Sequence, residues 1–155
     1  GLIQSHPDLT LTIVGHNPDP RLLKASENEA NIKFTGFVDE LESYYKNNRV
    51  YIAPLRFGAG MKVKVLNAMC RGIPTVTTSV GCEGMTVTDK KHLMIADESS
   101  EMIHAISELL DNKILWESLE NNSRQLIQEK YTWKALFKDM KVELDELLVN
   151  PSKES

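Results

Sequence analysis

The sequence is poor in the features that mark several classes of protein. It has four Phe, four Tyr and two Trp, and its formal net charge is −4, so a basic, aromatic surface for nucleic acid is not expected. Its two cysteines, Cys70 and Cys82, are too few for a disulfide framework or a paired metal motif. No apolar run approaches the length of a membrane span, and no signal peptide is visible. We therefore expect a cytoplasmic domain that binds neither nucleic acid nor metal.

The remaining composition is that of a globular domain. The chain has 155 residues, 41% of them apolar, which suffices for one hydrophobic core. We expect a single domain over residues 1–150 and a frayed polar tail over residues 151–155. The first residue is Gly1 rather than methionine, which favours a fragment or a processed chain.

Short apolar strands alternate with helical patterns along most of the chain. We predict strands at Leu11–Gly15, Ile32–Phe34, Val50–Ala53, Thr75–Thr78 and Leu93–Ala96, and helices at Glu40–Lys46 and Lys62–Arg71. Strands that are separated by helices form right-handed crossovers and parallel sheets. The predicted fold is therefore α/β, a Rossmann-like parallel sheet flanked by helices.

The chain becomes helical after residue 98. We expect a first helix capped by Ser99 or Ser100, a second helix, and a third capped by Thr132. Their apolar stripes comprise Met102, Ile103, Ile106, Leu109 and Leu110, then Leu115, Trp116, Leu119, Leu126 and Ile127, then Leu136, Met140, Leu144, Leu147 and Leu148. These helices are interpreted as structural.

The segment from Ala53 to Thr78 is the most informative, because it predicts a strand, a glycine-rich turn, a helix and a second strand. Gly58 and Gly60 let a ligand approach backbone N–H groups closely, and the helix dipole favours an anion. The apolar face of this helix comprises Val63, Leu66, Ala68, Met69 and Cys70. Lys62 and Lys64 at the helix start also favour a bound phosphate.

The glycine pair alone leaves two interpretations open, a tight connection or a phosphate site. There is neither a Walker A sequence nor a full Gly-x-Gly-x-x-Gly motif. In parallel sheets ligands lie beyond the carboxyl ends of the strands. Four loops begin there, over residues 15–20, 36–41, 55–61 and 79–85, and three of them carry glycine soon after the strand. A row of such loops favours a nucleotide site.

These motifs together resemble the C-terminal, donor-binding domain of GT-B fold glycosyltransferases of the group 1, GT4-like type. The resemblance covers nearly the whole chain. It rests on the sequences His6-Pro7-Asp8 with Leu11-Thr-Ile-Val-Gly15, Ile32-Lys-Phe-Thr-Gly-Phe-Val38, Pro54 to Met69, Gly72-Ile-Pro-Thr-Val76, Gly81-Cys-Glu-Gly84 and Tyr131-Thr-Trp133. It implies that the chain is one half of a GT-B fold. It also implies that the full enzyme transfers a hexose from a nucleoside diphosphate sugar to a glycan or lipid-linked acceptor, and that this half binds the donor.

The resemblance also implies which residues contact the donor. These are Gly15, His16, Phe37, Val38, Leu41, Arg56, Gly58, Ala59, Gly60, Met61, Lys62, Asn67 and Glu83. Phe37, Val38 and Leu41 would lie beside the base, and Gly58 to Lys62 would face the diphosphate and sugar. For Phe37 and Val38, ordinary burial is an equally good interpretation. The catalytic residues are not identified, and no cofactor beyond the nucleotide sugar is implied.

The chain departs from the family pattern in two ways. A glutamate pair of the family is matched by Ala59 and Asn67, and Asn67 lacks the charge that strengthens hydrogen bonds to ribose. The first strand of the domain and the N-terminal acceptor domain have no counterpart in these residues. We therefore expect the sheet either to close up between Leu11–Gly15 and Val50–Ala53 or to be completed by another chain, through strand exchange or a homo-oligomer.

Three functional hypotheses follow. The first is a glycosyltransferase, of which this chain is the donor-binding half and is inactive alone. The full-length enzyme of this hypothesis can attach peripherally to the inner face of a membrane. The second is a non-catalytic binding or scaffold domain on the same fold, motivated by Asn67. The third is another Rossmann-like enzyme such as a dehydrogenase. This chain lacks the acidic ribose ligand that such an enzyme would carry about 20 residues after the glycines.

Overall fold

The computed structural model describes residues 1–138, 140 and 141. They belong to two compact units, which we call unit 1 (Gly1–Asn47) and unit 2 (Asn48 onward). Each unit is described by itself. The expectation of a single domain over residues 1–150 stays a prediction, and the tail at 151–155 lies outside the described residues.

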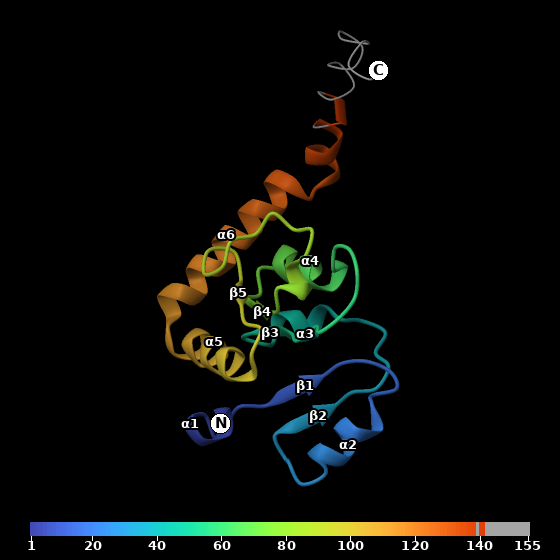
Figure 1. Cartoon of the computed structure of the whole chain (residues 1–155), viewed down its shortest axis with the longest axis vertical. Helices are drawn as coiled ribbons and strands as arrows, with labels where there is room; N and C mark the ends of the chain where they lie inside the picture. Colours follow the sequence, from blue (N-terminus) through green and yellow to red (C-terminus); the bar gives the residue numbers. More distant parts are fainter. Residues whose placement is uncertain (139, 142–155) are drawn as a thin grey trace. The chain divides into compact units, whose positions relative to one another are not determined.

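Unit 1 is built around two short parallel strands (Figure 1). Its elements are α1 (Leu2–Ser5), β1 (Leu11–Ile13), α2 (Pro20–Ser26), β2 (Ile32–Phe34) and α3 (Glu42–Lys46). Leu11 lies opposite Ile32 in the ladder, and Ile13 lies opposite Phe34. Every residue of 1–47 remains at least partly exposed. A two-stranded parallel sheet of this kind contributes little core of its own.

Two helices of unit 1 were missing from the sequence expectations. Helix α2 begins where the Asp19 carboxylate accepts a 2.8 Å hydrogen bond from the Arg21 backbone N–H, with Pro20 at the first helical position. An aspartate cap followed by proline is a recognisable helix start. Helix α1 has only four residues and no side-chain cap, so the sequence carries little signal for it.

Unit 2 holds a parallel sheet of order β3-β4-β5. Its elements are β3 (Tyr51–Ala53), α4 (Val63–Cys70), β4 (Thr75–Thr77), the 3-10 turn η1 (Val80–Cys82), β5 (Met94–Ile95), α5 (Ser99–Asp111) and α6 (Lys113–Lys130). Helices α4 and α5 both pack on the central strand β4, and α6 packs on both helices (Figure 1). Every residue of β4 is therefore fully buried. The predicted α/β fold with a helix-flanked parallel sheet is confirmed.

The core of unit 2 joins α4, the sheet and α6. Val65 and Met69 of α4 are completely buried, together with Leu93 before β5, and they pack with Leu126 and Ile127 of α6. The buried face of α4 differs from the expected one, because Val63 is 64% exposed and Cys70 is exposed, whereas Val65 is buried. The buried residues Val65, Ala68 and Met69 have i, i+3, i+4 spacing. The helix is thus rotated relative to the prediction.

The predicted caps of the C-terminal helices had mixed outcomes. Helix α5 is capped by Glu98, not by Ser99 or Ser100, because the Glu101 carboxylate accepts a 3.1 Å hydrogen bond from the Glu98 N–H. The prediction for Thr132 is confirmed, since its hydroxyl accepts a 3.2 Å hydrogen bond from the Ala135 N–H.

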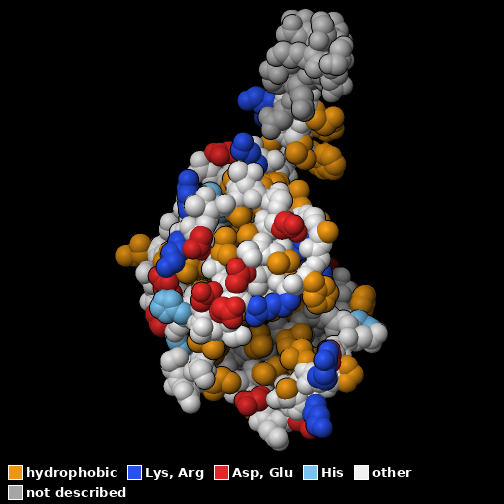
Figure 2. All heavy atoms as spheres, viewed as in Figure 1, with side chains coloured by type: hydrophobic (Ala, Val, Ile, Leu, Met, Phe, Trp, Pro, Cys, Tyr) orange, Lys and Arg blue, Asp and Glu red, His pale blue; other side chains and the backbone are white. Residues whose placement is uncertain are grey.

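The third C-terminal helix is described only in its first turns, from residue 133 to residue 141 with a gap at 139. Its exposed apolar side chains are Trp133, Leu136, Phe137 and Met140, and Figure 2 shows apolar side chains close to where the described chain ends. The predicted stripe residues Leu144, Leu147 and Leu148 lie outside the described residues.

Strand β1 belongs to unit 1 and strand β3 to unit 2, so the alternative in which the sheet closes up between them stays a prediction. Strand β1 pairs with β2, and β3 pairs with β4, in two separate sheets. Thus β1 and β3 each keep an edge that is unpaired among the described residues. Residues 1–10 of the described chain contain the helix α1 and no strand. Completion of the sheet by another chain stays a prediction.

Candidate functional site

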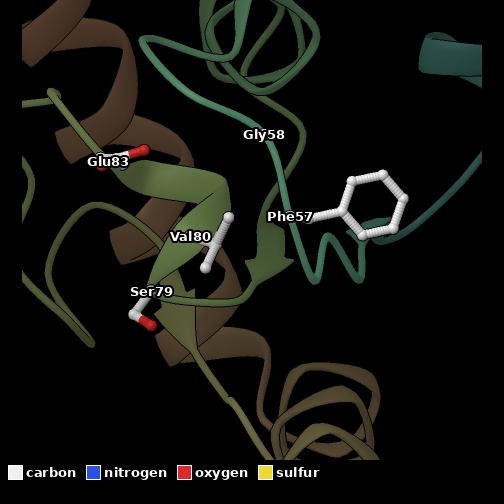
Figure 3. Close-up of a pocket in the computed structure, with 5 residues that line it drawn as sticks. All are labelled: Phe57, Gly58, Ser79, Val80 and Glu83. Carbon is white, nitrogen blue, oxygen red and sulfur yellow. The ribbon is translucent and has the colours of Figure 1, made fainter.

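Two loops beyond the carboxyl ends of β3 and β4 flank an open hollow in unit 2. We call residues 54–62 after β3 the glycine loop, and it faces η1, which follows β4. Between them lies a cavity of about 340 Å³. It is lined by Phe57, Gly58, Ser79, Val80 and Glu83 (Figure 3). The sequence thus placed a binding loop at an edge where the structure has an open hollow.

The labelled residues lie on two sides of this cavity. Figure 3 shows Gly58 and the backbone of Phe57 on one side and Ser79, Val80 and Glu83 along η1 on the other. The ring of Phe57 points away from the cavity and is 87% exposed. The cavity wall on that side is therefore largely backbone, which a ligand can approach closely.

The Lys62 side chain folds back onto the glycine loop. Its Nζ donates hydrogen bonds of 2.9 Å to the Gly58 carbonyl oxygen and 2.5 Å to the Gly60 carbonyl oxygen. The Glu83 Oε2 lies 3.6 Å from the same ammonium, whose side chain is only 13% exposed. Lys62 therefore holds the shape of the loop. Its expected contact with a diphosphate stays a prediction.

The backbone N–H groups of the glycine loop are available for a ligand. Gly58 and Gly60 have φ values of 121° and 73°, which other residues rarely adopt. Their carbonyl oxygens bond Lys62, whereas the structure gives no acceptor within the described residues for the N–H groups of Ala59, Gly60 and Met61. The N-terminus of α4 follows directly, and Lys62 is its N-cap. Free N–H groups beside a helix N-terminus favour an anion.

Asp97, which follows β5, holds η1 through its carboxylate and the glycine loop through its backbone carbonyl oxygen. The Asp97 carboxylate accepts hydrogen bonds from the Ser79 N–H at 2.8 Å and the Ser79 hydroxyl at 2.9 Å. These two bonds hold the pKa of Asp97 below its ordinary value, with a smaller contribution from Arg56. The Arg56 guanidinium donates to the Asp97 carbonyl oxygen. Arg56 thus serves as an anchor of the glycine loop in this structure.

Threonine hydroxyls lock the strand ends beneath the cavity. Thr77 Oγ1 donates to the Ala53 carbonyl oxygen at 2.8 Å, and Thr78 Oγ1 donates to the Leu55 carbonyl oxygen at 2.5 Å. Sequence reasoning did not single out these threonines, Ser79, Val80 or Asp97. Consecutive threonines at the end of a buried strand were the available signal.

The predicted residues of unit 1 gather at the ends of its own strands. The Gly15 N–H donates to the Gly36 carbonyl oxygen at 3.2 Å, which brings together the loops after β1 and β2. His16 is exposed, Phe37 is 73% exposed, Val38 is half-buried and Leu41 is 46% exposed. Burial therefore does not explain Phe37. These residues form one predicted group in unit 1, and the cavity residues form another in unit 2.

Asn67 does not belong to the cavity wall. It lies in the middle of α4 with an exposed side chain, and its backbone carbonyl accepts a 3.2 Å hydrogen bond from the Arg71 guanidinium. Ala59 and Met61 are exposed on the glycine loop. Glu83 is the predicted carboxylate that lines the cavity.

The described part of the chain shows no group of three or more His, Cys, Asp or Glu placed to hold a metal ion. Within it, every helix is too short or too polar to cross a bilayer. Burial raises the pKa of the Cys82 thiol, which bonds the Ser79 carbonyl oxygen at 3.4 Å. Cys82 is thus the last residue of η1 and packs in the core, where burial disfavours its reactive thiolate form.

Comparison with known sequences identifies the family to which this chain belongs. The family model "Glycosyl transferases group 1" matches residues 1–112. An uncharacterized 44.6 kDa protein in the cps region of Klebsiella pneumoniae is 31% identical over 143 residues, which is 88% of this chain and 37% of that protein. An uncharacterized glycosyltransferase of Methanocaldococcus jannaschii is 31% identical over 149 residues, which is 92% of this chain and 38% of that protein. The chain thus spans less than two fifths of either relative.

Solved structures agree on the fold. The C-terminal domain of the group 1 glycosyl transferase LpcC from Francisella tularensis has a TM-score of 0.71 at 18% identity, over 85% of this chain and 74% of that one. HepE from Anabaena, solved with UDP and glucose, has a TM-score of 0.76 at 15% identity, over 93% of this chain and 42% of that one. The chain therefore belongs to the group 1 glycosyl transferases and has the fold of the C-terminal domain of these GT-B enzymes.

Proposed function

We propose that this chain is the donor-binding part of a hexosyltransferase and that the cavity of unit 2 holds the diphosphate of a nucleoside diphosphate sugar. The observation that carries the proposal is the glycine loop, whose carbonyl oxygens are tied to Lys62 while its N–H groups have no acceptor in the described chain. A diphosphate would accept hydrogen bonds from those N–H groups and from the start of α4.

The chemistry of the loop suits transfer of a sugar. When the sugar leaves, negative charge grows on the diphosphate oxygen that carried it, and N–H groups fixed in advance stabilise that charge. The structural neighbour HepE was solved in complex with UDP and glucose, which supports a nucleotide sugar as the ligand class. Phe37, Val38 and Leu41 of unit 1 are proposed to contact the base.

The rest of the enzyme is also part of the proposal. The relatives are more than twice as long as this chain, so a second domain is proposed to bind a glycan or lipid-linked acceptor, and the chain alone is proposed to lack transferase activity. The full protein is proposed to work in the cytoplasm, where the inner face of a membrane presents lipid-linked acceptors. No metal is proposed.

A titration with nucleotides tests the proposal. UDP, UDP-glucose, GDP and GDP-mannose are added to the chain, and binding is measured by calorimetry and by amide NMR shifts of residues 57–62. We expect one nucleotide pair to bind and to shift those amides. Absence of binding by all four to the folded chain would overturn the proposal.

A charge-only comparison at Val80 sharpens the test. Val80 lines the cavity and is partly exposed, so Val80→Asp and Val80→Asn introduce side chains of one shape that differ in charge. We expect Val80→Asp to bind the nucleotide about tenfold more weakly than Val80→Asn, because a carboxylate repels the diphosphate. Equal affinities would place the anion elsewhere.

A scaffold role on the same fold is the second candidate, and one observation favours it. Asn67 stands where the family carries a glutamate, and its side chain is exposed outside the cavity wall. If this chain does not bind a donor, the replacement of the family's glutamate by Asn67 would explain the loss.

A further inference from the structure

We propose that Glu83 lets the cavity prefer a nucleotide sugar over the free nucleoside diphosphate. Its carboxylate would accept hydrogen bonds from the sugar hydroxyls and would repel a terminal phosphate. This inference rests on the proposed function, and it adds a residue that sets specificity and the sign of its effect.

The position of Glu83 puts one negative charge at the cavity. It directly follows η1, its side chain is 58% exposed, and among the described residues that line the cavity it alone carries a charge. Figure 3 shows its carboxylate on the η1 side, at the opposite end of the turn from Ser79. It therefore faces the space next to the glycine loop, where the ligand would sit.

Lys62 compensates this charge only in part. The ammonium is 3.6 Å from Glu83 Oε2, beyond hydrogen-bond distance, and it already donates to two carbonyl oxygens of the glycine loop. No other hydrogen bond to the Glu83 carboxylate exists among the described residues. The carboxylate thus keeps lone pairs for hydroxyl donors, and charge-assisted hydrogen bonds of that kind are strong.

The nucleotide sugar and the free nucleoside diphosphate differ in the charge of the second phosphate. In a nucleotide sugar both phosphates are diesters, with about one negative charge each, whereas a terminal phosphate carries about 1.5 to 2 at neutral pH. Near Glu83, the sugar offers hydroxyl donors and the free diphosphate offers extra negative charge. The same carboxylate therefore favours one ligand and disfavours the other.

The proposed transfer reaction would benefit from this difference. The bond between the anomeric carbon and the phosphate oxygen breaks, its electron pair stays on that oxygen, and the acceptor oxygen bonds the carbon as its proton is released. The site then holds a nucleoside diphosphate with a more negative terminal phosphate. Repulsion from Glu83 would speed its release, a step that limits many enzymes.

The experiment measures a ratio of affinities. Dissociation constants of UDP and UDP-glucose, and of GDP and GDP-mannose, are determined by calorimetry for the unchanged chain and for Glu83→Gln, Glu83→Asp and Glu117→Gln. Glu117 is exposed on α6 and forms an ion pair with Lys113, so Glu117→Gln makes the same change of net charge away from the cavity. Circular dichroism checks that every variant is folded.

We expect Glu83→Gln to tighten binding of the free diphosphate by about threefold to tenfold and to weaken binding of its sugar conjugate. Glu83→Asp should stay close to the unchanged chain, and Glu117→Gln should match it. If the unchanged chain binds nucleotides but Glu83→Gln leaves their ratio unaltered, this inference alone fails. If the unchanged chain binds none of the four nucleotides, the proposed function fails with it.

Discussion

The carboxylate of Asp97 accepts both hydrogen bonds that Ser79 can donate, from its N–H at 2.8 Å and its hydroxyl at 2.9 Å. Through this pair the turn before α5 holds the start of η1, and with it one wall of the cavity. Because the charged form of Asp97 makes these bonds, its pKa is lowered in the folded chain.

The lowered pKa predicts a pH dependence of stability. A group whose pKa is depressed by folding stabilises the fold above its unfolded pKa, here near 3.8, and loses that contribution as the pH falls through the folded value. Asp97→Asn should therefore lower the melting temperature at pH 7, and the difference should shrink below about pH 4. Thermal melts of both proteins between pH 2.5 and pH 7 check this. A difference that grows toward acid would contradict it.

Gly81 is predicted to tolerate no side chain. A Cβ at this position would lie 1.9 Å from the hydroxyl oxygen of Thr77, which is fully buried and bonds the Ala53 carbonyl oxygen. Gly81→Ala should lower the free energy of unfolding by about 2–4 kcal/mol, because the threonine must give up its place. Urea unfolding measures the loss.

Removing the clashing hydroxyl provides the control for Gly81. The double variant Gly81→Ala with Thr77→Ala should be less destabilised than the sum of the two single variants, since the pair share one contact. Strict additivity would show that the overlap with Thr77 is not the cause.

Lys62 is predicted to hold the glycine loop in shape. Lys62→Met keeps the length of the stem but removes the ammonium that bonds the Gly58 and Gly60 carbonyl oxygens. We expect faster amide hydrogen exchange over residues 57–62, a loss of about 1–2 kcal/mol in unfolding free energy, and weaker nucleotide binding. Lys64→Met is the matched control, because Lys64 is exposed in the first turn of the same helix. Equal exchange rates in the two variants would refute the clamp.

A substitution at Asn67 distinguishes a weakened donor site from a scaffold role. Under the proposed function, Asn67→Glu supplies a charged acceptor for ribose hydroxyls and should tighten nucleotide binding by about tenfold. Calorimetry with UDP-glucose and GDP-mannose measures the change, and Asn67→Gln, which adds length without charge, is the control. Identical affinities for the two variants would show that the residue at position 67 does not contact the ribose.

Much of the fold could be predicted from local patterns. The strand at Ile32–Phe34 has the predicted bounds, and the strands near Tyr51–Ala53 and Thr75–Thr77 differ by one residue at one end. Apolar runs bounded by Pro54 and Gly72 carry that information, since proline and glycine end regular elements for steric reasons. The face of α4 was harder, because adjacent apolar residues such as Val63 and Val65 leave its rotation open until the helix packs.

The candidate site was predictable as a loop and not as a set of contacts. The sequence by itself determined that glycines follow a strand and precede a helix, and hence that a phosphate-binding corner could form. Only the tertiary structure decided that Asp97 holds Ser79 across 18 residues and that Arg56 reaches Asp97 across 41. Such partners meet only after parallel strands bring their carboxyl ends to one edge, because local propensity carries no information about residues that are distant in the chain.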